Sequence, residues 1–290
     1  MLYTSPDEWR DAPAKRVLLF GMSGLGKTHV SNMLRRSGGW FHYSVDYRIG
    51  TRYMGEHIVD NFKREAMRTP FLADLLRTDS IYIASNITFN NLSPLSTYLG
   101  KPGDPAKGGL PFSEYMRRQN LHREAEISAL LDTRRFAARA KDLYGYDNFV
   151  CDSGGSICEV VDPADPRDRV LSALAQDHLM VWIKGDAAHT EELKRRFDAD
   201  PKPMYYHPEI LSRLWTTYLE NAGVSEETVD PDDFIRWAYG EALAHRAPRY
   251  EEMAQNWGVK VLADDVARLD SAAAFDEMIC DALGKSGQTP

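Results

Sequence analysis

The residues most suggestive of chemistry lie between positions 21 and 28, which read Gly21-Met-Ser-Gly-Leu-Gly26-Lys27-Thr28. This stretch fits the phosphate-binding pattern G-x-x-x-x-G-K-[ST] at every fixed position. Glycines let the backbone wrap closely, so that successive N–H groups point inward at phosphate oxygens. A helix beginning at Lys27 would add the positive end of its dipole. Lys27 would supply a cation to the β- and γ-phosphates, and the Thr28 hydroxyl would ligate Mg²⁺.

We therefore predict a nucleotide site that uses ATP and Mg²⁺ as cofactors. The alternative is a chance match in a glycine-rich turn, and the expected strand before the loop and helix after it argue against that alternative. The nucleotide-binding residues predicted in this stretch are the loop and the residue that follows it: Gly21, Met22, Ser23, Gly24, Leu25, Gly26, Lys27, Thr28 and His29.

An acidic residue at the end of a later apolar run is a second candidate metal ligand. The run is Phe149-Val-Cys-Asp152, and in phosphate-loop folds a carboxylate in this position commonly holds Mg²⁺, directly or through water. We predict Thr28 and Asp152 as the metal ligands. An ordinary helix cap is the alternative for Asp152, because a Ser-Gly-Gly turn follows it.

The elements that must position these residues follow an alternating pattern. Short apolar runs typical of buried strands are separated by stretches with helical spacing. This alternation predicts an α/β fold with three layers, in which a parallel sheet carries helices on both faces. The expected strands cover residues 16–20, 148–151, 179–183 and 259–262.

We expect one phosphate-loop domain over residues 15–284, with a polar lead-in at 1–14 and a C-terminal tail at 285–290. Two segments exceed a minimal version of this fold, at about 67–120 and 205–245. The first contains a possible strand at 81–84 and a Gly/Pro run at 100–109, which indicates a mobile surface loop. The second is typical of added helices.

Composition restricts the class of protein. The chain has 290 residues, of which 43% are hydrophobic, and a net charge of −8. These values are typical of a soluble enzyme and argue against a general nucleic-acid partner. No apolar run is long enough to span a membrane, the N-terminus lacks an export signal, and three cysteines are too few for a zinc or disulfide framework. We expect a cytoplasmic protein whose partner is a small-molecule acceptor, with a protein partner possible at the two added segments.

Several dispersed motifs resemble those of shikimate kinases, within the nucleoside-monophosphate-kinase-like group. Phe41-His-Tyr-Ser44-Val-Asp46-Tyr-Arg-Ile49 stands where the family has F-x-D-x-D-x-x-I, with Ser44 in place of the first aspartate. Arg123-Glu-Ala-Glu126-Ile-Ser-Ala-Leu130 follows the family's R-x-x-E-x-x-x-L. Arg246-Ala-Pro248-Arg-Tyr250-Glu-Glu252-Met-Ala254 follows R-x-P-x-Y-x-E-x-A.

Two further segments match this family less closely. Asp152-Ser-Gly154-Gly155 resembles its glycine-rich substrate turn, and Arg195 and Lys202-Pro-Met resemble its lid arginine and R-P-L. The resemblance implies a P-loop NTPase fold of the shikimate/nucleoside-monophosphate kinase type with inserted lid segments. It also implies phosphorylation of a hydroxyl on a small acceptor, for which we expect an anionic group.

The resemblance also implies roles for individual residues. The catalytic residues would be Lys27, Asp46 and Lys202, and Arg195 would contact the nucleotide. The acceptor would be bound by Asp46, Arg123, Gly154, Gly155 and Arg246. Each assignment beyond the loop has a structural alternative: Asp46 a helix N-cap, Arg123 a solvated ion-pair face, Arg195 a basic helix face.

The added segments argue against shikimate itself as the acceptor, because a small pocket does not require them. Two other functions stay open at this point. One is a nucleotide-gated regulatory ATPase that uses the same loop, and the other is a nucleotide 5′-hydroxyl kinase.

Overall fold

The computed structural model describes residues 1–286, and in it the chain forms two compact units. Unit 1 comprises residues 1–45, 127–200 and the C-terminal part from residue 238. Unit 2 comprises residues 46–126 and 201–237. The single domain expected from the sequence is thus made of two compact parts, which we describe separately.

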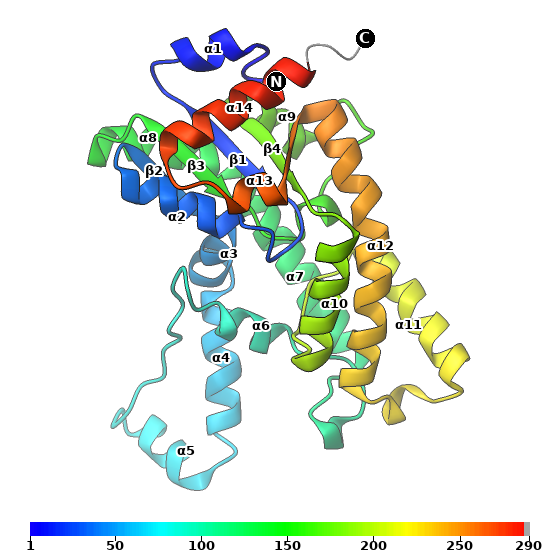
Figure 1. Ribbon diagram of the computed structural model, residues 1–290. Helices are drawn as coiled ribbons and strands as arrows, with labels where there is room; N and C mark the ends of the chain where they lie inside the picture. The colour runs from blue at the N-terminus through cyan, green and yellow to red at the C-terminus, as the bar shows by residue number, and fades with distance from the viewer. Residues whose placement is uncertain (287–290) are drawn as a thin grey trace. The chain divides into compact units, whose positions relative to one another are not determined.

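Unit 1 contains a five-stranded sheet in which every neighbouring pair of strands is parallel (Figure 1). The strand order is β2-β3-β1-β4-β5. This sheet confirms the predicted α/β class, and β2 is the one strand that the sequence patterns did not single out. The strands are β1 Arg16–Phe20, β2 Trp40–Ser44, β3 Asn148–Asp152, β4 Leu179–Lys184 and β5 Gly258–Leu262.

Helices contact both faces of this sheet. On one face, Val17 and Leu19 of β1 belong to a buried cluster with Val30 and Leu34 of α2 (Lys27–Ser37) and with the apolar side of α14 (Ala272–Ser286). On the other face, the Tyr43 ring of β2 packs against Phe136 of α8 (Thr133–Tyr144) at 5.0 Å. Alternate residues of each strand point to opposite faces, so both faces can be covered by apolar contacts.

The first fourteen residues are more than the polar lead-in expected from the sequence. They form α1 (Pro6–Asp11), whose Trp9 is fully buried and donates from its indole nitrogen to Asp276 of α14 at 3.1 Å. The Trp9 ring also meets the Phe275 ring at 6.4 Å. Trp9 and Tyr3, whose rings lie 5.1 Å apart, both belong to the buried core cluster and attach this segment to unit 1.

The C-terminal end also differs from expectation. Helix α14 continues through Ser286, so residues 285 and 286 belong to a helix, and the rest of the expected tail lies outside the described residues. The other helical elements of unit 1 are η3 Ile157–Glu159, α9 Arg169–Asp177, α10 Ala187–Ala199 and α13 Ala263–Ala267.

Unit 2 is helical, and within residues 46–126 and 201–237 the structure has isolated bridges but no strand. The predicted added helices near residues 205–245 are therefore confirmed. Three helices, α3, α7 and α12, contain boundaries between the two units. The elements are α3 Val45–Arg48, the π-helix η1 Ile49–Tyr53, α4 Gly55–Ala66, α5 Pro70–Arg77, α6 Ser93–Leu99, η2 Pro105–Lys107, α7 Phe112–Leu131, α11 Pro208–Ala222, η4 Glu226–Thr228 and α12 Pro231–Trp257.

Two sequence expectations within unit 2 were wrong. Residues 81–84 form no strand, because no neighbouring strand pairs with this apolar run. Its Tyr82 side chain is 90% exposed. The segment 100–109 is not an unattached loop: the Asp104 backbone N–H donates to the Val229 carbonyl at 2.8 Å, and Lys107 pairs with Asp230 at 2.9 Å. Glycines there allow close backbone approach rather than mobility.

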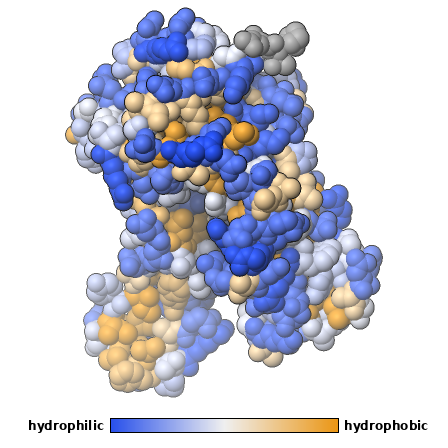
Figure 2. Space-filling view, in the orientation of Figure 1, coloured by the Kyte–Doolittle hydropathy of each residue, from blue (hydrophilic) through white to orange (hydrophobic). Residues whose placement is uncertain are grey.

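Apolar side chains lie on the surface around α5. Phe71 is 70% exposed and Met67 is 38% exposed, and Figure 2 shows hydrophobic side chains gathered over this part of unit 2. Across residues 1–286, none of the helices has both the length and the apolar character that a membrane span requires.

Candidate functional site

The predicted phosphate-binding loop, residues 21–28, leads from β1 into α2, so the strand before it and the helix after it are as its sequence pattern predicts. Gly21 has φ of 135°, and a Cβ built on it would lie 2.6 Å from the Ile183 carbonyl oxygen of β4, so only glycine fits there. The Lys27 side chain donates to the carbonyls of Gly21 and Met22, at 2.8 and 2.9 Å. The loop thus curls around its lysine at the N-terminus of α2, the arrangement that phosphate binding requires.

The two predicted metal ligands lie next to each other. The Thr28 hydroxyl donates to the Asp152 carboxylate at 2.7 Å. Pairing of β1 with β3 sets Asp152 beside Leu19, just before the loop, which explains how residues so distant in sequence meet. His42 of β2 lies near the same carboxylate, with its Nε2 3.9 Å from Asp152 Oδ2.

The chemistry of this pair fits magnesium bound together with a nucleotide. Mg²⁺ is usually held by one or two protein oxygens, with phosphate oxygens and water completing its octahedron. Within residues 1–286 no group of three or more His, Cys, Asp and Glu side chains is arranged to hold a metal ion. The hydroxyl and carboxylate therefore suit a metal that arrives with phosphates.

A turn rich in glycine follows β3 and lies against the loop. The Ser153 hydroxyl donates to the Leu19 carbonyl of β1 at 2.8 Å. Two residues later, the Gly155 carbonyl accepts from Arg246 Nη1 at 3.0 Å and from the Tyr250 hydroxyl, both on α12. The turn is thus held from the sheet on one side and from a helix on the other.

Arg246 is buried and paired with a carboxylate that sequence reasoning did not identify. Its Nε donates to Glu159 Oε1 at 2.7 Å, and the side chains of Arg246 and Glu159 are 8% and 1% exposed. Burial is the largest influence and by itself would lower the pKa of Arg246, but the charge of Glu159 and its hydrogen bond, together with Tyr250 and Cys158, leave that pKa above its usual value. A charged pair so deeply buried is strongly destabilised when one partner is removed.

Cys158, beside this pair, is not a reactive thiol. Burial raises its pKa to about 12, so it stays protonated at neutral pH, and thiolate is the reactive form. Cys151 and Cys280 are buried as well.

The predicted lid arginine lies on the exposed side of α10. Arg195 forms two hydrogen bonds with Glu192, each 2.7 Å long, and its side chain is 71% exposed. Its neighbours Lys194 and Arg196 also pair with glutamates of this helix, so Arg195 lies on the basic helix face that the sequence left open as an alternative. Contact with a nucleotide stays a prediction for Arg195.

The remaining predicted residues belong to unit 2. Asp46 lies in the first turn of α3 rather than at its N-cap, Arg123 lies on α7 with its Nη1 3.4 Å from Glu124, and Lys202 is exposed after α10. The structure describes these three within their own unit, so their roles toward an acceptor stay predictions.

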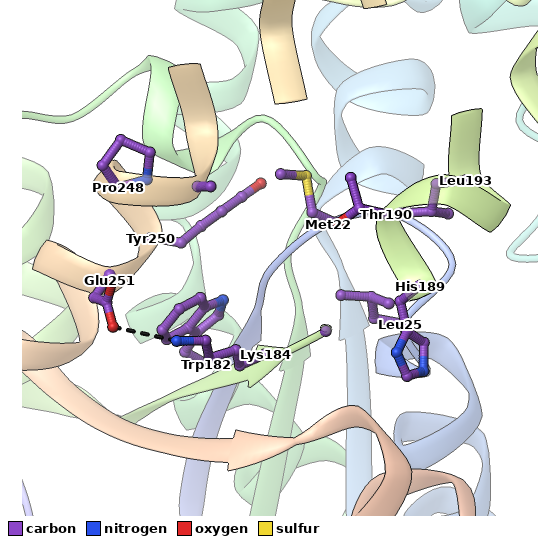
Figure 3. Close-up of a pocket in the computed structure, with 12 residues that line it drawn as sticks. Met22, Leu25, Trp182, Lys184, His189, Thr190, Leu193, Pro248, Tyr250 and Glu251 are labelled. Atoms are coloured by element: carbon purple, nitrogen blue, oxygen red, sulfur yellow. Dashed lines mark hydrogen bonds and ion pairs between the residues drawn. The ribbon is translucent and has the colours of Figure 1, made fainter. Parts of the chain in front are cut away.

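A cavity of about 360 Å³ opens beside the phosphate-binding loop (Figure 3). Met22 of the loop and Tyr250 of α12 point toward each other across it, above the indole of Trp182. At one edge, Lys184 Nζ lies 3.3 Å from Glu251 and 5.2 Å from the centre of the Trp182 ring. The cavity has apolar walls and one charged edge, and its volume suits a small organic group.

Sequence reasoning missed Glu159 and two of the residues that line this cavity, Trp182 and Lys184. Glu159 stands within Ile157-Cys-Glu-Val-Val161, and a lone acid among apolar residues is a signal that a buried cation lies nearby. The cavity residues Trp182 and Lys184 come at the end of an apolar strand and carried no comparable signal.

Comparisons with known proteins add little to these observations. No protein-family model and no curated protein sequence matches the chain. Similar solved structures include shikimate kinase from Bacteroides thetaiotaomicron, with 14% identity, alignment over 94% of each chain and a TM-score of 0.37. This TM-score is too low to establish a shared fold. The function proposed below therefore depends on the loop and its neighbours.

Proposed function

We propose that the chain is an ATP- and Mg²⁺-dependent phosphotransferase of the P-loop kinase type, which phosphorylates a hydroxyl of a small metabolite. The observation that carries this proposal is the loop wrapped around Lys27, with the Thr28 hydroxyl 2.7 Å from Asp152. Phosphoryl transfer needs positioning and charge neutralisation more than covalent help from the protein, and this arrangement supplies both.

The residues of unit 1 would act on the phosphates. Lys27 is already directed into the loop, where its ammonium would neutralise charge on the β- and γ-phosphates. Thr28 and Asp152 would hold Mg²⁺, directly or through water, which would supply positive charge beside the phosphates. Arg195 would reach the nucleotide by exchanging Glu192 for a phosphate, since an exposed ion pair is weak.

The residues of unit 2 would select the acceptor. Asp46 would accept the proton of the attacking hydroxyl, the role that an aspartate has in the catalytic loop of protein kinases. Arg123 would pair with an anionic group of the acceptor, because a guanidinium can form two parallel hydrogen bonds with a carboxylate or phosphate. Its present partner, Glu124, is a neighbouring residue whose side chain is 74% exposed.

Mass spectrometry of reactions with ATP and Mg²⁺ tests the proposal. A panel of hydroxy acids, sugars, polyols and nucleosides should yield one class of product heavier by a phosphoryl group. Lys27→Ala should abolish its formation, and the control Lys141→Ala, at a position on α8 whose side chain is 70% exposed, should not.

A parallel reaction without acceptor identifies a pure hydrolase. Phosphate release from ATP alone, at a rate that no member of the panel changes, would refute transfer to these acceptors and favour the nucleotide-gated ATPase. Release of neither phosphate nor product, from a protein that stays folded, would contradict both activities.

A further inference from the structure

The most deeply buried charged pair of unit 1 lies outside the predicted phosphate and metal ligands. Glu159 uses one carboxylate oxygen to accept from Arg246 Nε at 2.7 Å, and its other oxygen lies 3.3 Å from His245 Nε2. Burying two charges is costly unless close partners offset the loss of water, so this pair constrains how α12 packs against residues 155–161.

Arg246 also reaches the glycine turn after β3. Its Nη1 donates to the Gly155 carbonyl at 3.0 Å, and the Tyr250 hydroxyl, one helical turn further along α12, donates to the same oxygen. Both donor residues are buried, so loss of either hydrogen bond would not be made good by water. The backbone position of Gly155 is thus set by two side chains of one helix.

Gly155 in turn touches the phosphate-binding loop. A Cβ built on Gly155 would lie 2.5 Å from the Ser23 hydroxyl and 3.2 Å from the Ser23 backbone nitrogen. The nitrogen of Ser23 is one of the loop donors predicted to face phosphate. A shift of the turn would therefore move Ser23, and at its other end the same segment carries Asp152, which is bonded to Thr28.

This arrangement conflicts with a role for Arg246 as a ligand of the acceptor. A carboxylate of the acceptor that took the Nε position would have to displace Glu159, which is almost fully buried. At Nη1 it would have to share the nitrogen with the Gly155 carbonyl. Two ready-made partners at 2.7 and 3.0 Å already use its fork.

We propose that Arg246 is a positioning residue for the phosphate-binding loop: together with Tyr250 it fixes Gly155 against Ser23, and Glu159 holds it in place. This proposal rests on the proposed function in one respect, that the loop binds a nucleotide. It replaces the expectation, implied by family resemblance, that Arg246 contacts the acceptor.

Calorimetric titration with Mg·ADP tests the proposal without knowledge of the acceptor. Arg246→Gln should raise the dissociation constant about tenfold, since it removes a charge-assisted hydrogen bond to Gly155. Glu159→Gln should also weaken Mg·ADP binding, because it loosens Arg246. Tyr250→Phe should raise the constant about threefold, as expected for loss of one neutral hydrogen bond.

Arg249→Gln is the matched control. Arg249 lies on the same helix and donates to the carbonyls of Cys158 and Val161, but it does not contact Gly155 or Glu159. The Arg249→Gln substitution removes the same charge as Arg246→Gln, and Arg249 holds the same segment of the chain. If weaker Mg·ADP binding came only from a general loss of packing there, this variant would show it too. Its Mg·ADP affinity should equal that of the wild type.

The outcomes separate this proposal from the proposed function. A wild-type protein that binds no Mg·ADP would refute the nucleotide site itself. Wild-type affinity in folded Tyr250→Phe and Glu159→Gln variants, or an equal loss in Arg249→Gln, would overturn the positioning role alone. Tyr250→Phe keeps the buried ion pair intact, so it decides the question even if Arg246→Gln does not fold.

Discussion

Replacing Gly21 by alanine should destabilise the protein more than replacing any glycine whose surroundings are open. Its φ of 135° lies outside the range that alanine adopts easily, a strain of about 1–3 kcal/mol. The new Cβ would also stand 2.6 Å from the Ile183 carbonyl oxygen, which belongs to the backbone of β4 and has little freedom to move. Crowding of this kind costs about 1–3 kcal/mol more.

Gly38→Ala provides the comparison for this estimate. Gly38 follows α2 with φ of 81°, and a Cβ built on it would meet nothing within 4 Å, so only backbone strain of about 1–3 kcal/mol applies. Urea denaturation of both variants measures the difference in the free energy of unfolding. Equal losses would refute the claim that the loop is pressed against the end of β4.

Three further predictions concern the metal ligand, a buried histidine and the loop of unit 2. Asp152→Asn should raise the Mg²⁺ concentration needed for half-maximal ATP binding by about tenfold, because it removes the charge that attracts the cation; an unchanged requirement would make Asp152 purely structural. Burial lowers the pKa of His178 to about 4. In the unfolded chain the histidine has an ordinary pKa of about 6.5, so as pH falls the unfolded chain takes up a proton before the folded protein does. The free energy of unfolding should therefore keep its full value above pH 6.5 and decrease by roughly 3 kcal/mol by pH 4. Urea denaturation of His178→Phe should show a smaller decrease over that window, and an identical pH dependence would contradict the assignment. Deletion of residues 101–108 should lower the melting temperature by several degrees, because it removes the Asp104–Val229 hydrogen bond and the pairs of Lys101 with Asp232 and Lys107 with Asp230; an unaltered melting curve would show that these contacts contribute little.

The sheet and the loop could be predicted from the sequence because their signals are local. Short apolar runs, residues 17–20 and 149–151, mark β1 and β3. The spacing of Gly21, Gly26 and Lys27 is fixed by backbone geometry that few other sequences satisfy. Asp152 followed from its place at the end of a strand. The contact that it makes with Thr28 depends only on two neighbouring parallel strands.

The errors arose where structure depends on distant residues. Residues 81–84 form an apolar run like that of a buried strand, but a strand needs a neighbour, and this segment pairs with none. The Gly/Pro composition of residues 100–109 cannot reveal that Val229 and Asp230 lie beside it. Trp9 was hidden for the same reason, since its partners Phe275 and Asp276 are near the opposite end of the chain.

The role of Arg246 shows a different limit. A motif can indicate that an arginine belongs near a site, but the partner that uses its charge lies 87 residues earlier in the chain. Spacing within R-x-P-x-Y carries no information about Glu159. Tyr250, in the same motif, donates to the same glycine turn, so the motif is equally compatible with holding that turn in place.

Calorimetric titration of the wild-type protein with ATP, in the presence and absence of Mg²⁺, tests the central claim most directly. The account predicts one nucleotide bound per chain, tighter with Mg²⁺ than without it, and no binding in Lys27→Ala. Absence of heat from a folded wild-type protein at millimolar Mg·ATP, or equal binding by Lys27→Ala, would contradict a phosphate-binding loop at residues 21–28.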